Sequence, residues 1–62
     1  MELGNKHNLE AMAGQIRTIV AAAEELKRMS GGVPAVDKNA DAILAFAHIL
    51  ESSVSDILEL DA

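Results

Sequence analysis

The sequence contains no cysteine, tryptophan or tyrosine, and only one proline, one phenylalanine and two histidines among its 62 residues. Without cysteine there is no disulfide and no thiolate metal site, and two histidines are too few to build a closed zinc site alone. A chain this short buries only about 60% of its unfolded surface and needs a further source of stability. Self-association is the source that remains.

Long hydrophobic runs and basic clusters are also missing. Uninterrupted apolar runs such as Ile19–Ala23 and Ala42–Ala47 are far shorter than the roughly 20 residues that cross a bilayer, and Met1–His7 lacks the apolar core of a secretory signal. Five basic residues stand against ten acidic ones, giving a net charge of −5. Binding to nucleic acid or to anionic lipid requires a clustered basic surface. We therefore expect an acidic, cytoplasmic protein that binds neither nucleic acid nor membrane, which disfavours a two-helix DNA-binding regulator.

Half of the residues are apolar, and in the first half of the chain they recur with helical spacing. A helix is predicted over about residues 8–30, with one apolar side. That side comprises Leu9, Met12, Ala13, Ile16, Ile19, Val20, Ala23 and Leu26. Glu24 and Arg28 have the i,i+4 spacing of a helical ion pair. Gly14 interrupts the helix, either as a tolerated glycine or as a place where another helix approaches closely.

A connector is predicted at residues 31–36. Gly31–Gly32 is typical of a helix end with a residue in the left-handed conformation, and Pro34 prevents the first helix from continuing. The segment lacks the Gly-Lys-Ser/Thr sequence of a phosphate-binding loop. Asp37 is the best candidate to cap a second helix over about residues 37–60. A connector this short favours antiparallel neighbours.

The second helix has an apolar face that spans about half its circumference, which one neighbouring helix cannot cover. This face comprises Ile43, Phe46, Ala47, Ile49, Leu50, Val54, Ile57 and Leu58. We therefore predict an all-α protein whose single domain, residues 1–62, is an antiparallel two-helix hairpin. Two hairpins would form a homodimeric four-helix bundle, although a tetramer or larger array is also open. The predicted dimer interface is Ile43, Phe46, Ile49, Leu50, Val54 and Ile57.

One local motif suggests a different role. The segment Ala47-His48-Ile49-Leu50-Glu51-Ser52-Ser53 resembles the phospho-acceptor segment of histidine phosphotransfer domains, which reads Ala-His-x-Leu-Lys-Gly-Ser/Ala-Ser on a bundle helix. The resemblance implies that His48 is an exposed phospho-acceptor. Glu51 stands where that family has lysine, and Ser52 stands where it has glycine.

Other chemistry has less support in the sequence. His48-x-x-Glu51 reverses the Glu-x-x-His order of bundle metal sites, and the serines have no base and orienting acid in a recognisable pattern. We predict no metal, no cofactor and no enzymatic activity. The expected function is a small self-associating helical module with a structural or protein-interaction role, which docks a copy of itself or another protein helix. The alternative is a signalling element in which His48 accepts a phosphoryl group.

Overall fold

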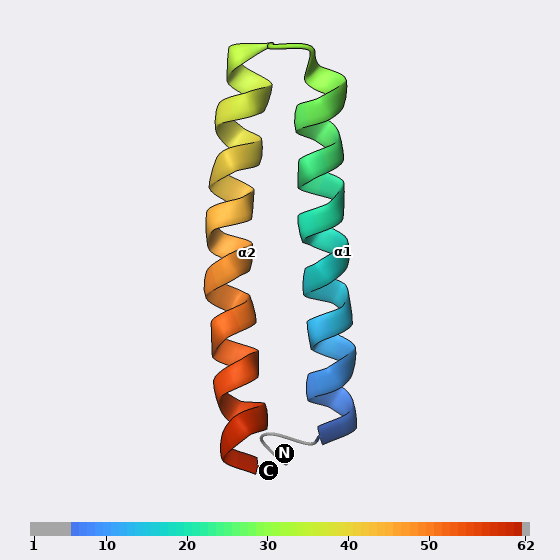
Figure 1. Ribbon diagram of the computed structural model, residues 1–62, viewed down its shortest axis with the longest axis vertical. Helices are drawn as coiled ribbons and strands as arrows, with labels where there is room; N and C mark the ends of the chain where they lie inside the picture. The colour runs from blue at the N-terminus through green and yellow to red at the C-terminus, as the bar shows by residue number, and fades with distance from the viewer. Residues whose placement is uncertain (1–5, 62) are drawn as a thin grey trace.

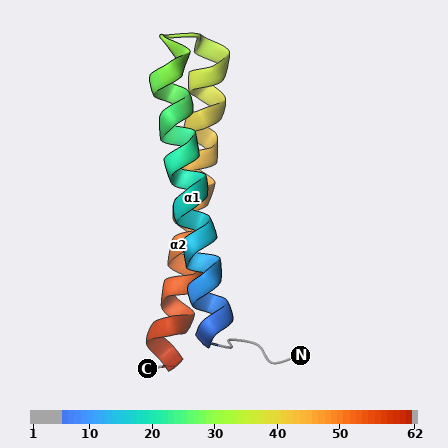
Figure 2. The ribbon, with the colours of Figure 1, turned by 90° about the vertical axis from the view of Figure 1, so that its right-hand side faces the viewer.

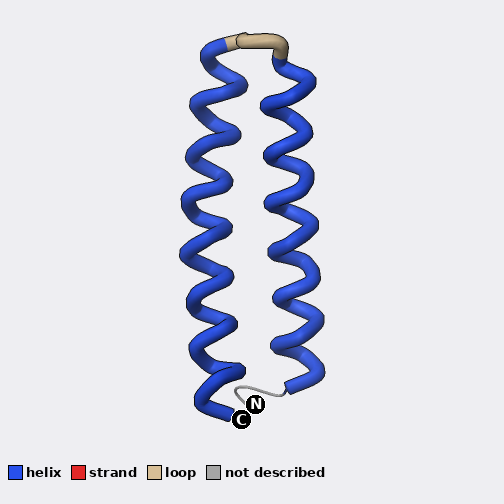
Figure 3. Tube along the Cα trace, viewed as in Figure 1, coloured by secondary structure: helices blue, strands red, loops and turns tan. Residues whose placement is uncertain are grey.

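The protein is an antiparallel hairpin of two long helices, α1 (Lys6–Ser30) and α2 (Pro34–Asp61), which lie side by side along their whole length (Figure 1). The computed structural model describes the backbone of residues 6–61 and the side chains of residues 8–58. Seen from the side, the helices cross at a shallow angle (Figure 2). The connector at one end is the only loop between them (Figure 3). The predicted helical hairpin is thus confirmed.

The connector is shorter than expected, because α2 begins at Pro34 rather than at Asp37. Proline suits the first helical position, since its φ angle is already helical and the N–H that it lacks would have had no partner there. The Asp37 N–H donates to the Val33 carbonyl at 3.0 Å, the first hydrogen bond of α2. The prediction that Asp37 caps the helix was therefore wrong. Its carboxylate lies within the first turn, where negative charge still favours the helix dipole.

The two glycines of the connector both have positive φ, 62° at Gly31 and 95° at Gly32. These angles end α1 in the left-handed manner that the sequence predicted. The Val33 N–H then donates to the Ser30 side-chain oxygen at 2.8 Å. Three residues therefore reverse the chain between helices of 25 and 28 residues.

The core of the hairpin is a single row of small and medium-sized side chains. Buried residues recur every seven positions in both helices: Leu9, Ile16 and Ala23 in α1, and Ala40, Ala47 and Val54 in α2. Because the helices are antiparallel, Leu9 lies at the level of Val54, Ile16 at the level of Ala47, and Ala23 at the level of Ala40. The side chains thus diminish toward the connector, where Ala23 and Ala40 allow close approach of the helices. A seven-residue repeat is the spacing of supercoiled helices.

Ion pairs lie on the surface of the hairpin. Lys27 Nζ of α1 lies 2.6 Å from Asp41 Oδ1 of α2, which links the helices near the connector. Arg28 pairs with Glu25, its Nε donating to Glu25 Oε2 at 2.9 Å, rather than with Glu24 as the sequence suggested. The i,i+3 position is also adjacent on a helix, so both acids were within reach.

Candidate interaction surface

A second row of apolar residues lies beside the buried row of each helix. It occurs three positions after each buried residue: Met12, Ile19 and Leu26 in α1, and Ile43, Leu50 and Ile57 in α2. A step of three rotates a side chain by about 60° from the buried row. Because the helices are antiparallel, the same rotation in both places the two rows on one side of the hairpin. Five of these six side chains keep between 39% and 47% of their surface exposed.

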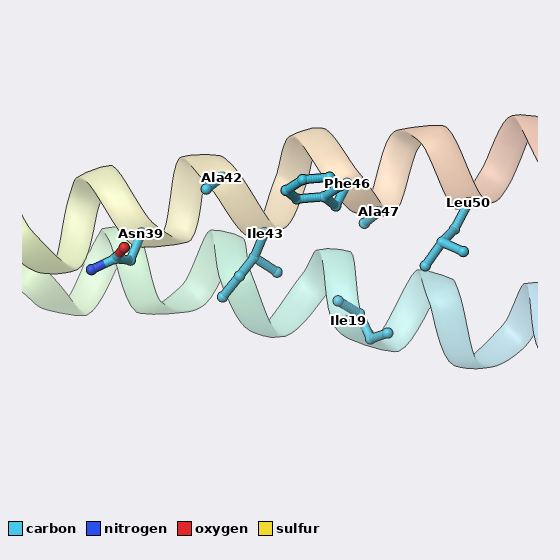
Figure 4. A pocket seen from close by; sticks show the side chains of 7 residues that line it. All are labelled: Ile19, Asn39, Ala42, Ile43, Phe46, Ala47 and Leu50. Carbon is cyan, nitrogen blue, oxygen red and sulfur yellow. The ribbon is translucent and has the colours of Figure 1, made fainter.

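Phe46 extends this surface. It is 69% exposed, the most exposed large apolar side chain of α2 within the described residues. Ile43 and Leu50 reach from α2 toward α1, whereas the Phe46 ring lies over α2 itself (Figure 4). We call the surface formed by Met12, Ile19, Leu26, Ile43, Phe46 and Leu50 the apolar face.

The apolar face is hollowed along the line between the helices. One groove of about 470 Å³ is lined by Ile19, Asn39, Ala42, Ile43, Phe46, Ala47 and Leu50. A second, of about 390 Å³, is lined by Asn8, Ala11, Met12, Gln15, Ile16, Leu50 and Val54. Leu50 borders both, so the two hollows follow one another along the hairpin. Neither lining contains an ionisable side chain.

The other side of the hairpin carries charge. Lys27, Asp41, His48 and Glu51 lie rotated from the buried rows in the direction opposite to the apolar face. The hollow that includes Glu51 is smaller, about 240 Å³, and is lined also by Ala13, Val54, Ser55 and Leu58. Asp41 accepts a hydrogen bond from the Lys27 ammonium and, together with nearby Asp37, raises the pKa of that group. The two grooves on one side of the hairpin therefore have uncharged linings, whereas the opposite side carries ionisable groups.

The structure divides the six residues that the sequence proposed for the dimer interface. Ile43, Phe46, Ile49 and Leu50 are exposed. Val54 is only 8% exposed, because α1 already covers it, and Ile57 packs against the same core. A second chain would therefore gain most from the first four. Ile49 points almost directly away from α1 by helical projection, so it lies at the outer edge of the surface.

The six residues of the interface prediction all belong to α2. Met12, Ile19 and Leu26 are as exposed as Ile43 and Leu50, and they lie on the same side. The signal was present in the sequence, because these residues repeat every seven positions in register with Leu9, Ile16 and Ala23. Only the paired arrangement of the helices shows that the two rows form one surface.

His48 lies on the charged side with 64% of its side chain exposed. Its Nδ1 is 3.0 Å from Glu51 Oε1, one helical turn further along. A carboxylate at this distance orients the imidazole ring and places negative charge beside the Nδ1 atom. The outward position expected of a phospho-acceptor is present.

Two other kinds of site have no candidate in the described part of the chain. No three histidine, aspartate or glutamate side chains there come together in a way that could hold a metal ion. Neither α1 nor α2, within its described residues, is long and apolar enough to cross a membrane.

Comparisons with other proteins give no assignment. No protein-family model matches the sequence, and the searches of curated proteins and of solved structures found no match.

Proposed function

We propose that the protein is a non-enzymatic, self-associating helical module. In this proposal two hairpins pack their apolar faces together as a four-helix bundle, and the assembled bundle serves a structural or protein-interaction role. The observation that carries the proposal is the long, uncharged apolar face, which the hairpin cannot cover by itself.

The exposed area of one hairpin supports a partner of about its own size. A monomeric protein of 6.5 kDa exposes about 3,800 Å² when folded, whereas this chain exposes 4710 Å². The difference, about 900 Å², is close to the roughly 800 Å² that each partner contributes to a standard interface. The radius of gyration of the hairpin is 14.1 Å, whereas a compact chain of this length has a radius of gyration of about 11 Å. The single hairpin is therefore more extended than a compact protein of its size.

The spacing of the apolar residues also suits a helical partner. In a four-helix bundle each helix contacts two neighbours, so it needs two adjacent apolar rows at steps of three and four. Both helices have such rows, and the hairpin itself uses only one of them. A second hairpin would use the other.

The linings of the two grooves favour recognition over catalysis. General acid–base or nucleophilic chemistry needs a titratable group or an activated nucleophile in a pocket. The two grooves of the apolar face offer aliphatic side chains, one aromatic ring and the amides of Asn8, Gln15 and Asn39. Such a surface can bind an apolar helix.

Sedimentation velocity across a range of protein concentrations tests this proposal. We expect a dimer at micromolar concentration. A charge at the centre of the apolar face, Leu50→Glu, should shift the protein to monomer because an ionised carboxylate would be buried without a partner. Ser52→Glu is the matched control, since it adds the same charge at an exposed position outside that face. A wild-type monomer, or equal dimer populations in both variants, would contradict the proposal.

A second candidate function rests on the exposed position of His48. In it, His48 accepts a phosphoryl group from a phosphodonor and passes it to a partner protein. Incubation of a protein carrying His7→Gln, which leaves His48 as its one histidine, with phosphoramidate, followed by ³¹P NMR, should then show an acid-labile phosphate that His48→Gln abolishes. Labelling that persists in the variant would rule His48 out as the acceptor.

A further inference from the structure

The two helices differ at the edges of the apolar face. We call Ala11, Gln15, Thr18 and Ala22 the α1 flank, and Asn39, Ala42, Phe46 and Ile49 the α2 flank. All eight are exposed, and each set lies on the outer side of its helix next to the apolar face. The α1 flank consists of small or flexible side chains, whereas the α2 flank carries two large ones.

Two hairpins that meet face to face can be related by a two-fold axis in either of two directions. An axis parallel to the helices places α2 of one copy beside α1 of the other, with both connectors at the same end. An axis across the helices places α2 beside α2 and α1 beside α1, with the connectors at opposite ends. All neighbouring helices are antiparallel in both arrangements, so crossing geometry does not distinguish them.

We infer that the axis runs parallel to the helices, so that the α2 flank of each hairpin packs on the α1 flank of the other. This inference rests on the self-association proposed above. It identifies the partner surface for Phe46 as the α1 flank of a second copy.

Side-chain size is the first argument. An axis parallel to the helices keeps every residue at its own level. In the hairpin, Ile16 lies at the level of Ala47, so Phe46 of one copy would lie over Gln15 and Thr18 of the other. The crossed axis would instead set the α2 flanks, with Phe46 and Ile49, against each other and leave the alanine-rich α1 flanks facing across a gap. Helix separation follows the size of the side chains at the contact, so the mixed pairing gives the more even packing.

Charge is the second and independent argument. The sequence of α1 contains four basic and three acidic residues, a net charge of +1, whereas that of α2 contains one basic and six acidic residues, a net charge of −5. The crossed axis places the two acidic helices side by side. The parallel axis places each acidic helix between two nearly neutral ones, which lowers the repulsion.

Distances between labelled cysteines test the inference, and the chain has no native cysteine to interfere. Val33→Cys places a nitroxide label at the connector. The hydrogen bonds of residue 33 to Ser30 and Asp37 involve its main chain, so cysteine preserves them. Ala45→Cys places a label near the middle of α2, at an exposed position outside the apolar face.

Pulsed electron paramagnetic resonance on each labelled variant should give a short distance at position 33, within the roughly 20 Å width of a four-helix bundle. The crossed axis would separate these labels by about the 42 Å length of the hairpin. The label at position 45 lies near mid-length, so its distance is similar in both arrangements and reports dimer formation alone. A long distance at 33 with coupling at 45 would overturn the inferred axis and leave the dimer standing. Absence of coupling at both positions, with a monomer in sedimentation, would overturn both.

Discussion

Replacing Phe46 with alanine should weaken dimerisation strongly while leaving the single hairpin almost unaffected. In the hairpin, 69% of the Phe46 surface is exposed. A phenylalanine side chain offers about 200 Å², so a partner covers at most about 140 Å² of it. At about 25 cal/mol per Å² this contributes about 3.5 kcal/mol per copy as an upper limit.

Alanine keeps part of this contact, so we expect a loss of about 2–3 kcal/mol per copy and about 4–6 kcal/mol per dimer. Because each 1.4 kcal/mol is about a factor of ten, the dissociation constant should rise by about 10³–10⁴. Alanine also has the higher helix propensity, so the fold of one hairpin should not suffer.

Sedimentation equilibrium of the wild type and of Phe46→Ala measures this change, and circular dichroism confirms that helix content is retained. Lys38→Ala is the control, since it removes a long exposed side chain from the side of α2 that faces away from α1. We expect it to change the dissociation constant by less than about tenfold. A Phe46→Ala protein that dimerises as tightly as the wild type would refute the reasoning, because the ring would then lie outside the interface.

Ile16→Ala should lower the free energy of unfolding by about 2–4 kcal/mol in urea titrations, because Ile16 belongs to the buried row; an unchanged midpoint would show that the row is not a packed core. Gly14→Ala should raise stability by about 0.5–1 kcal/mol, since an added Cβ meets only the end of the Arg17 side chain at 3.7 Å, and a loss would indicate close approach of another chain. Gly31→Ala should lower stability by about 1–2 kcal/mol, because φ is +62°, a left-handed conformation that alanine adopts only with strain. An added Cβ would meet no atom within 4 Å, so the backbone conformation alone accounts for the loss. Asp41 raises the pKa of Lys27, so this pair stabilises the fold below the ordinary lysine pKa. Its contribution should disappear as the pH rises above about 10.4 and through the raised value, and melting curves of Lys27→Met should lack that step.

The pH dependence on the acid side has the opposite sign. The hydrogen bond from Arg28 lowers the pKa of Glu25, so the contribution of this pair is present above the ordinary glutamate pKa and is lost as the pH falls through the lowered value. Both groups are exposed, so the effect on melting should be small and should shrink further in high salt.

The sequence determined the class and order of the secondary structure elements. Apolar residues at steps of three and four specify helices, and two glycines followed by proline specify where one helix ends. The starting point of α2 was misread because Asp37 looked like a cap, although proline is well suited to the first turn. Similarly, Arg28 had two acidic residues within reach, and spacing alone did not select Glu25.

The tertiary structure decided which apolar residues the hairpin uses for itself. Val54 and Leu50 belong to the same periodic pattern, yet α1 covers Val54 and leaves Leu50 half exposed. That difference depends on how each helix is rotated about its own axis relative to its neighbour. A periodic pattern gives the width of the apolar face of a helix, but it does not say which part of that face contacts the other helix. Only the packed pair showed that Met12, Ile19 and Leu26 join Leu50 on one side of the hairpin, because that requires two segments distant in sequence to lie side by side.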